Sequence, residues 1–188
     1  NSEFFLSRDE EESAFPIEGT SEDLSEAMSL FDDFDDLDDI YISDINAELI
    51  NTYAIVRDHI EELIKLLKKY QLEYVPLETE ARKSYYITRR ERFNDLKVNG
   101  NEAENIEKAA LMIFLNKTCF NGLYRVNTSG KFNVPFGQYD HPNICDEELI
   151  MANHGVLQKV DIYVGGYKNI TRHLGKRYNF IYIDPPYR

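Results

Sequence analysis

The strongest constraint on the fold is an apolar run near the carboxyl end of the chain, which a proline turn follows at once. Residues 178–183, Tyr-Asn-Phe-Ile-Tyr-Ile, are aromatic and β-branched and predict a buried strand. Asp184, Pro185, Pro186 and Tyr187 come directly after it. Such strands are typical of α/β proteins, whose parallel sheets bind ligands beyond the carboxyl ends of their strands. The run therefore predicts an α/β fold with a candidate site at the turn.

This turn carries a carboxylate, a carbonyl group of restricted direction and an aromatic face. Pro185 fixes its own φ and restricts Asp184 to extended geometry, so the acceptors of the turn have few directions in which to point. A carboxylate beside such a carbonyl can accept both hydrogens of an exocyclic amine, while the ring of Tyr187 can stack on the base that carries the amine. An ordinary proline turn explains Asp-Pro-Pro equally well, but the tyrosine and the preceding strand favour the functional interpretation.

A second motif lies in the middle of the chain. It reads Phe-Leu-Asn-Lys-Thr-Cys-Phe-Asn-Gly-Leu-Tyr-Arg-Val-Asn over residues 114–127 and Gly-Lys-Phe-Asn-Val-Pro-Phe-Gly over residues 130–137. Residues 126–134 predict a β-hairpin that turns at 127–130 and presents Arg125 and Lys131 outward. Arginine can form two hydrogen bonds to guanine, so this hairpin is a candidate for reading base edges in a DNA groove.

Both motifs resemble those of one enzyme family. Tyr-Ile-Asp-Pro-Pro-Tyr at residues 182–187 looks like the catalytic motif of S-adenosylmethionine-dependent amino methyltransferases, in the form typical of N6-adenine enzymes. The middle motif is similar to the DNA-recognition region of Dam-type DNA adenine methyltransferases, the alpha group of the D12 class. The resemblance runs from about residue 41 to residue 188. It implies an α/β fold: a Rossmann-like S-adenosylmethionine-dependent methyltransferase sheet with an inserted, mostly helical DNA-recognition subdomain that contains a β-hairpin.

The resemblance implies methyl transfer to N6 of adenine in double-stranded DNA. The adenine would be flipped out of the duplex into the pocket. Asp184 and the carbonyl group of Pro185 would orient its amine, Pro186 would complete the turn, and Tyr187 would stack on the base. S-adenosylmethionine would supply the methyl group by direct displacement, so the enzyme would act mainly by positioning the reactants.

The resemblance also implies a set of DNA contacts in the middle motif. The matching residues are Phe120, Asn121, Leu123, Arg125, Asn133 and Pro135. Phe120 matches the aromatic side chain that wedges into the duplex, and Arg125 matches the residue that reads guanine. The family often has tyrosine where Phe120 stands, but a wedge needs only an apolar face, so we expect little effect of this difference.

A strand early in the chain ends in an acidic side chain. Residues 41–46 predict a short strand that contains Asp44, and an amphipathic helix follows over residues 47–57. An acid at such a strand end accepts hydrogen bonds from ribose hydroxyls in nucleotide-binding βαβ units, although an isolated Asp in this place is more often a helix N-cap. The resemblance favours cofactor binding by Asp44 and Ile45, because the family carries a cofactor-binding Asp-Ile-Asn-like segment here.

The next predicted strand, residues 159–164, is followed by Gly165, Gly166 and Tyr167. Paired glycines let the backbone approach a ligand closely, although they more often mark a simple turn. In the family, the corresponding segment lies against the adenine of the cofactor. The resemblance thus adds Tyr167, together with Asp184, to the predicted S-adenosylmethionine site.

Helices are predicted between these two strands. Asp58 is expected to cap a helix with an apolar stripe of Ile60, Leu63, Ile64 and Leu67. Further helices are predicted to begin at Thr79 and within residues 101–105. Asp146 is expected to cap a short helix over residues 147–153. The helix from Thr79 carries Tyr85, Tyr86, Arg89, Arg90, Arg92 and Phe93, which either contact phosphates and stack on bases or form an ordinary solvated face.

Charge divides the chain unevenly. The formal net charge is −13, but residues 1–40 hold fifteen Asp and Glu and one Arg, while the remaining residues hold 19 acidic and 20 basic side chains. We expect 1–40 to be an acidic, low-order segment, a solvated insertion rather than a DNA mimic or partner-binding tail. Residues 41–69 and 146–188 are expected to belong to the catalytic domain, and 70–145 to a target-recognition insertion. The near-neutral body remains compatible with a DNA partner.

The sequence argues against several other classes of protein. No apolar run approaches the roughly 20 residues that span a bilayer, and the acidic N-terminus does not resemble a signal peptide, so we expect no membrane partner and a cytoplasmic location. Cys119 and Cys145 predict free thiols, and the four scattered histidines predict no metal site. We expect a monomer.

Two cofactor elements of the family, a Lys-containing N-terminal segment and a Phe-x-Gly-Gly-Gly-like loop, are not recognisable here, and the chain stops at Arg188 before the sheet would be complete. We therefore expect a fragment of a site-specific enzyme of DNA modification or restriction-modification, whose implied target is GATC. The alternatives are a truncated DNA-binding remnant without activity and an RNA base methyltransferase.

Overall fold

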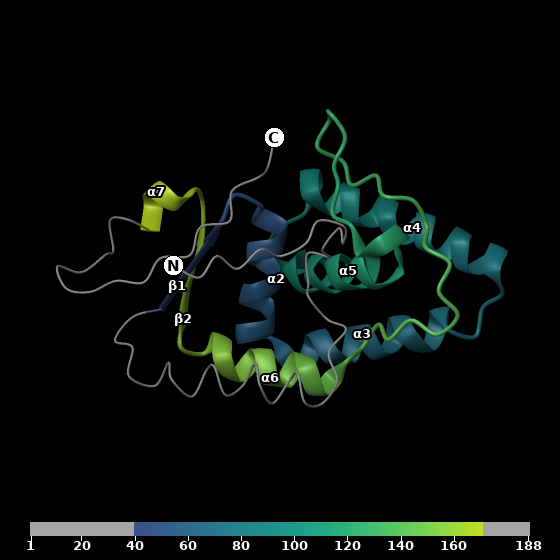
Figure 1. Cartoon of the computed structure of the whole chain (residues 1–188), viewed down its shortest axis with the longest axis horizontal. Helices are drawn as coiled ribbons and strands as arrows, with labels where there is room; N and C mark the ends of the chain where they lie inside the picture. Colours follow the sequence, from purple (N-terminus) through teal and green to yellow (C-terminus); the bar gives the residue numbers. More distant parts are fainter. Residues whose placement is uncertain (1–39, 171–188) are drawn as a thin grey trace, which may run out of the picture.

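A pair of parallel strands beside a group of helices makes up residues 40–170, the part of the chain that the computed structural model describes (Figure 1). Strand β1 (Ile40–Asp44) pairs in parallel with β2 (Val160–Val164), with Ile40 opposite Val160 and Asp44 opposite Val164. The predicted acidic segment up to residue 39, the predicted strand 178–183, and Asp184, Pro185, Pro186 and Tyr187 lie outside the described residues.

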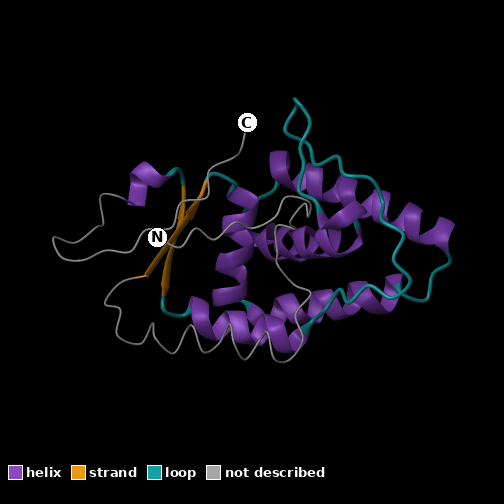
Figure 2. Ribbon diagram, viewed as in Figure 1, coloured by secondary structure: helices purple, strands orange, loops and turns teal. Residues whose placement is uncertain are grey.

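Helices fill the chain between the strands, and Figure 2 shows most of them to one side of the strand pair. They are α2 (Ala47–Asp58), α3 (Ile60–Tyr74), α4 (Thr79–Asn99), η2 (Glu102–Glu104), α5 (Asn105–Thr118), η3 (Phe120–Gly122) and α6 (Glu147–Leu157), with α7 (Tyr167–Ile170) after β2. The architecture is therefore α/β with mostly helices and a small two-stranded parallel sheet, in agreement with the predicted class.

Helix α5 lies at the centre of the core. Its residues from Ala109 to Met112 are all buried, as are Phe114 and Leu115, so the helix is apolar around most of its circumference and must be enclosed. Helices α2, α3 and α4 supply that enclosure. Edge-on ring contacts join Phe114 to Tyr70, Tyr74 and Tyr85 at centroid distances of 5.3–5.7 Å. Truncation of such a ring costs about 3–5 kcal/mol, so this cluster is a main source of stability.

The helix ends confirm two of the predicted start signals and correct a third. Thr79 begins α4, and Asp146 Oδ1 accepts a hydrogen bond from Leu149 N at 3.2 Å, although α6 continues to Leu157 rather than ending near residue 153. The predicted cap by Asp58 is wrong. Its carboxylate pairs with Arg57 at 2.8 Å, and His59 takes the N-cap position of α3 without a side-chain hydrogen bond. Asp58 is still the last residue of α2, and Arg57 engages both of its carboxylate oxygens, so the side chain is not free to cap α3.

The aromatic and basic side chains of α4 are used inside the fold. Tyr86 and Phe93 are 0% exposed, so they neither stack on bases nor belong to a solvated face. The Arg89 guanidinium lies over the ring of Tyr70 at 4.8 Å and over the ring of Tyr85 at 4.6 Å, where cation–π attraction holds it. Both interpretations of this helix are therefore wrong for these residues.

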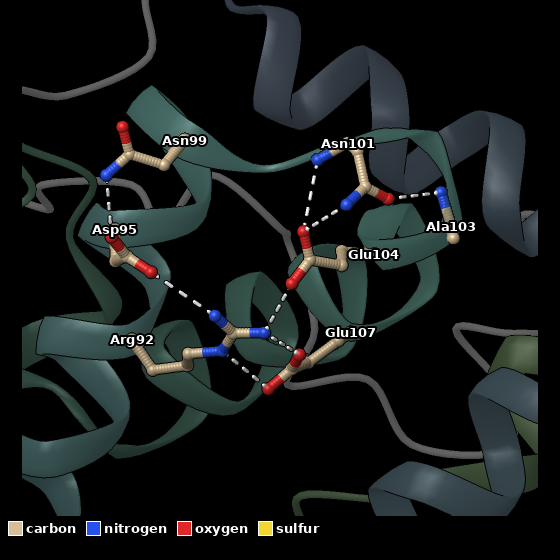
Figure 3. Close-up of polar contacts among 7 residues, drawn as sticks. All are labelled: Arg92, Asp95, Asn99, Asn101, Ala103, Glu104 and Glu107. Atoms are coloured by element: carbon tan, nitrogen blue, oxygen red, sulfur yellow. Dashed lines mark hydrogen bonds and ion pairs between the residues drawn. The ribbon is translucent and has the colours of Figure 1, made fainter.

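Arg92 is the centre of an ion-pair cluster that joins α4 to α5 (Figure 3). Its guanidinium lies 2.7 Å from Glu104 and 2.7 Å from Glu107. Hydrogen bonding to Arg92 holds the pKa of Glu104 below its usual value. Glu104 also completes a capping box with Asn101 at the start of η2. With its guanidinium committed in this way, Arg92 has a structural role.

Candidate functional site

The carboxyl ends of the two strands meet at one edge of the sheet. Asp44 lies opposite Val164, and Gly165 N donates a hydrogen bond to Asp44 O at 2.8 Å, which carries the pairing one residue further. Ser43 Oγ donates to Gly165 O at 2.6 Å. The pairing thus brings the predicted cofactor residues Asp44, Ile45 and Tyr167 together from distant parts of the sequence. We call these three residues and Val164 the strand-end edge.

The Asp44 carboxylate is half-buried at this edge, and it does not cap the following helix. Asn46 caps α2, because its Oδ1 accepts hydrogen bonds from Glu48 N at 3.1 Å and Leu49 N at 3.2 Å. Asp44 Oδ1 accepts from Asn46 N at 2.6 Å and so shapes the turn before the helix. A carboxylate has two oxygens and about four acceptor positions, so this single bond leaves capacity for hydroxyl donors.

Three large apolar side chains are exposed around this carboxylate. Ile45 is 77% exposed, Val164 56% and Tyr167 58%, in contrast to the buried residues of the nearby core. Apolar side chains beside a few fixed polar groups are the usual lining of a site for a flat, partly polar ligand. The sequence interpretation included Ile45 and Tyr167 and missed Val164. Its place at the end of β2, opposite Asp44, was the signal that could have found it.

The middle motif forms a second exposed surface, on residues 119–137, which we call the recognition segment. An isolated antiparallel bridge joins Cys119 to Phe136, and another joins Val126 to Phe132. Between them Phe120 N donates to Pro135 O at 2.9 Å. The predicted hairpin is present as this pairing rather than as two continuous strands, and Figure 1 shows it as the loop that projects at the top of the view.

The tip of the hairpin is built by side-chain hydrogen bonds. Asn127 Oδ1 accepts from Ser129 N at 3.1 Å and from Lys131 N at 3.0 Å, and Asn127 N donates to Lys131 O at 2.9 Å. Gly130 takes a φ of 74°, which other residues rarely adopt. Arg125 and Lys131 are both exposed, as the hairpin pattern predicts.

A tight turn at the other end of the recognition segment presents an aromatic ring to solvent. Phe120 is 51% exposed, although Cys119 before it is 0% exposed. Asn121 and Gly122 both adopt left-handed conformations, with φ of 52° and 59°, and asparagine and glycine are the residues that tolerate this geometry. Asn121 and Pro135 are exposed beside Phe120, whereas Leu123 and Asn133 are half-buried.

Tyr124 joins the recognition segment to the helix that follows the strand-end edge. Its hydroxyl donates to Glu48 Oε2 at 3.4 Å and accepts from Lys97 Nζ at 3.2 Å. Lys97 also pairs with Glu48 at 3.5 Å, and these two side chains are only 12% and 18% exposed. Burial, followed by the Glu48 charge, raises the pKa of Tyr124 above its ordinary value. Sequence reasoning missed this link, because nothing local pairs Tyr124 with Glu48.

Other chemistry is limited within the described range. Across residues 40–170, no group of three or more His, Cys, Asp or Glu side chains is arranged to hold a metal ion, and no helix is long and apolar enough to cross a membrane. Cys119 and Cys145 are free thiols, as predicted. Burial raises the pKa of the Cys119 thiol to about 11, so it is protonated and unreactive near neutral pH.

Sequence comparisons show that this chain is similar to DNA methyltransferases. The sequence profile of the D12 class N6 adenine-specific DNA methyltransferases matches residues 27–188. The type II methyltransferase M.MjaIII of Methanocaldococcus jannaschii is 39% identical over 149 residues, which cover 79% of this chain and 50% of that protein. The type II methyltransferase M1.LlaDCHI of Lactococcus lactis subsp. cremoris is 36% identical over 78% of this chain and 49% of its own length. The DNA adenine methylase of Escherichia coli (strain K12) is 32% identical over 78% and 48%. The chain spans about half the length of these relatives.

Proposed function

The chain belongs to the family of D12 class N6 adenine-specific DNA methyltransferases, and from this premise we propose that it transfers a methyl group from S-adenosylmethionine to N6 of adenine in a short, specific sequence of double-stranded DNA. The observation that carries the DNA part of the proposal is the exposure of Phe120 on a fixed backbone. An exposed aromatic ring on a fixed backbone presents an apolar face that a partner can contact, and an apolar wedge that separates stacked bases is one such use.

The strand-end edge suits the adenosine part of S-adenosylmethionine. The half-buried Asp44 carboxylate has acceptor capacity for ribose hydroxyls, and the exposed side chains of Ile45, Val164 and Tyr167 can cover the faces of an adenine ring. In the proposed reaction, the cofactor supplies a methyl group on a positively charged sulfur atom. The chain's own contribution at this edge is to hold the nucleoside and to exclude water from it.

The recognition segment would hold the duplex. Phe120 would enter the base stack, and Asn121, Leu123 and Pro135 would contact neighbouring bases. Arg125 would read guanine and Asn133 would support this surface. The rigid underside favours this role, since Phe132 and Val134 are 3% and 1% exposed and anchor the segment in the core. A surface held in one shape loses little conformational freedom on binding.

The catalytic groups would come from the turn after the predicted strand 178–183. We propose that Asp184 and the carbonyl of Pro185 accept the two amine hydrogens of a flipped adenine, that Pro186 stiffens the turn, and that Tyr187 stacks on the base. Both acceptors keep the nitrogen lone pair directed at the methyl group. On this proposal, residues 41–69 and 146–188 contribute to the catalytic domain, and residues 70–145 form the target-recognition insertion.

The experiment is a methyl-transfer assay with the purified full-length protein. Labelled S-adenosylmethionine is supplied with a DNA duplex that contains GATC, with duplexes that carry single-base changes in that site, and with an RNA duplex of the same sequence. We expect N6-methyladenine in the GATC duplex. Methylation of RNA alone, or binding to DNA without any methyl transfer, would contradict the proposal and favour the RNA enzyme or the inactive remnant.

A pair of variants separates the wedge from general surface effects. Phe120→Ala should lower methyl transfer at least about tenfold, because the flipped state loses the side chain that fills the space. Val98→Ala is the matched control, because Val98 is 72% exposed on α4 and lies outside the recognition segment. Equal effects of the two changes would assign Phe120 no special part in DNA binding.

A further inference from the structure

We propose that Asn133 is a positioning residue for Arg125: it holds the guanidinium at its Nε edge, so that the terminal fork is presented to guanine, and does not itself hold the duplex. This inference rests on the proposed function, because it concerns how the recognition segment reads its target. It assigns Asn133 an indirect part in specificity rather than a direct DNA contact.

Three hydrogen bonds join the two residues across the hairpin. Arg125 Nε donates to Asn133 Oδ1 at 2.9 Å, and Arg125 Nη2 donates to the main-chain oxygen of Asn133 at 3.3 Å. In the opposite direction, Asn133 N donates to Arg125 O at 3.1 Å. Asn133 therefore fixes both the backbone and the side chain of Arg125, although the arginine side chain is exposed to solvent.

The backbone around Asn133 is itself held firmly. Asn94 Oδ1 accepts from Phe132 N at 2.7 Å, and Asn94 Nδ2 donates to Phe132 O at 3.0 Å. On the other side, Val134 O accepts hydrogen bonds from Tyr86 Oη at 2.9 Å and from Arg90 Nη1 at 3.2 Å. Side chains of helix α4 thus hydrogen-bond to the residue before and to the residue after Asn133, so the backbone of Asn133 is held in one position.

The donors that Asn133 leaves free are the ones that guanine requires. A guanidinium has five N–H donors, and Asn133 engages one on Nε and one on Nη2. The remaining hydrogens on Nη1 and Nη2 form the terminal fork, which matches the paired acceptors O6 and N7 of guanine. A free arginine side chain loses rotamer entropy when it binds, and a side chain already held in place loses less of it. Discrimination should therefore depend on Asn133.

A direct contact between the Asn133 amide and a DNA phosphate is the competing explanation, and variants at Asn133 and Arg125 separate the two. The measurement is kcat/KM for methylation by the full-length protein, with the preferred duplex and with duplexes that replace the guanine read by Arg125. Asn133→Ala should lower the preference for guanine about tenfold, part of the discrimination of a bidentate pair. Asn133→Asp keeps the oxygen acceptor and should keep the preference, whereas a carboxylate facing a phosphate would weaken binding to every sequence.

The double variant gives the decisive comparison. In an Arg125→Ala background, Asn133→Ala should leave the preference for guanine unchanged, because a residue that acts through Arg125 has nothing left to position. Val98→Ala, an exposed change on α4 outside the recognition segment, is the control that should have no effect in either background. Thermal unfolding of each variant shows whether the hairpin still folds.

The outcomes distinguish this inference from the proposed function. If Asn133→Ala weakens binding and methylation of all duplexes by the same factor, Asn133 is a phosphate contact and the inference is wrong. If Arg125→Ala and Asn133→Ala lower the preference for guanine additively in the double variant, the inference is also wrong. If the wild type transfers no methyl group, the proposed function fails. If Arg125→Ala leaves the preference for guanine intact, the assignment of Arg125 fails. If the wild type is active and Arg125→Ala loses the preference, an unaltered preference in Asn133→Ala overturns the positioning role alone.

Discussion

The hydroxyl group of Tyr124 donates a hydrogen bond to Glu48 Oε2 at 3.4 Å, although the two residues are 76 positions apart in the sequence. Tyr124 lies between two candidate DNA contacts, and Glu48 lies in the first turn of the helix that follows Asp44. The bond therefore joins the two surfaces that the proposed function needs. Lys97 completes the group by pairing with Glu48, so the half-buried carboxylate has a charged partner as well as a hydroxyl donor.

Stability should fall at alkaline pH because buried tyrosines retain their protons in the folded state. Burial raises the pKa of Tyr70 and of Tyr74 to about 12, and burial together with Glu48 raises the pKa of Tyr124. In the unfolded chain, tyrosine ionises near pH 10, so above that pH the folded state binds more protons than the unfolded state. The stabilisation is complete below about pH 10 and is lost as the pH rises towards the folded pKa values.

The measurement is the melting temperature as a function of pH, for the wild type and for Tyr124→Phe. The variant lacks the hydroxyl and should be less stable near neutral pH. The difference should narrow above about pH 10, since only the wild type loses the contribution of Tyr124 there. A constant difference across the whole range would contradict the assigned pKa direction.

Gly137 should be intolerant of a side chain. A Cβ atom there would lie 2.5 Å from Cys119 O and 2.6 Å from Cε2 of Tyr139. Since Cys119 O belongs to the backbone, which cannot move without disturbing the recognition segment, Gly137→Ala should lower the free energy of unfolding by about 1–3 kcal/mol. Gly155→Ala is the control, because nothing lies within 4 Å of its Cβ position in α6, and it should stabilise the protein by about 1 kcal/mol. Urea unfolding measures both, and equal effects would refute the steric argument.

Asp44→Ala should weaken S-adenosylmethionine binding by about 1.5–3 kcal/mol, the scale of a hydrogen bond to a charged group, which is roughly a 10- to 150-fold rise in Kd. Titration calorimetry with the full-length protein measures it. Asp161→Ala provides a matched control, because Asp161 lies exposed in β2 away from the strand-end edge. An unchanged affinity in Asp44→Ala would leave Asp44 only its hydrogen bond to Asn46 in the turn.

Arg125→Ala should relax specificity at one base pair by about 1–3 kcal/mol, because a phosphate contact cannot replace the two hydrogen bonds to guanine. Lys131→Ala, a change of another exposed cation in the same hairpin, should instead weaken all sequences alike and lower the salt dependence by about one unit. Methylation of the preferred site and of each single-base variant at fixed salt tests both. A uniform loss in Arg125→Ala would show that this residue contacts the backbone of the duplex.

Asp184→Ala should lower methyl transfer by about a hundredfold or more while DNA affinity stays within a few-fold, because the carboxylate orients the amine and not the duplex. Single-turnover rates and fluorescence anisotropy with the same duplex measure the two quantities. Near-normal turnover of the purified variant would remove Asp184 from the mechanism.

Patterns of a few neighbouring residues were enough to predict the local features of this protein. Strands at Asp44 and Val164, the helix from Thr79 and the cap at Asp146 follow from patterns that extend over only a few residues. The same holds for the hairpin tip, where the Asn127 side chain bonds to residues within one turn. The cap predicted at Asp58 failed because an adjacent Arg57 competes for the same carboxylate, and sequence patterns do not rank two local partners.

Which of the candidate side chains are free to bind a partner depends on contacts between distant segments of the chain. Arg92 and Tyr86 are of residue types that often contact nucleic acids. However, Arg92 is ion-paired with Glu107, and Tyr86 is buried against the recognition segment, so neither is available to a partner. The pairing of Asp44 with Val164, and of Tyr124 with Glu48, joins residues that share no local signal. The exposure of a side chain and the groups it bonds to are set by these contacts, which form only when the core around α5 brings the segments together.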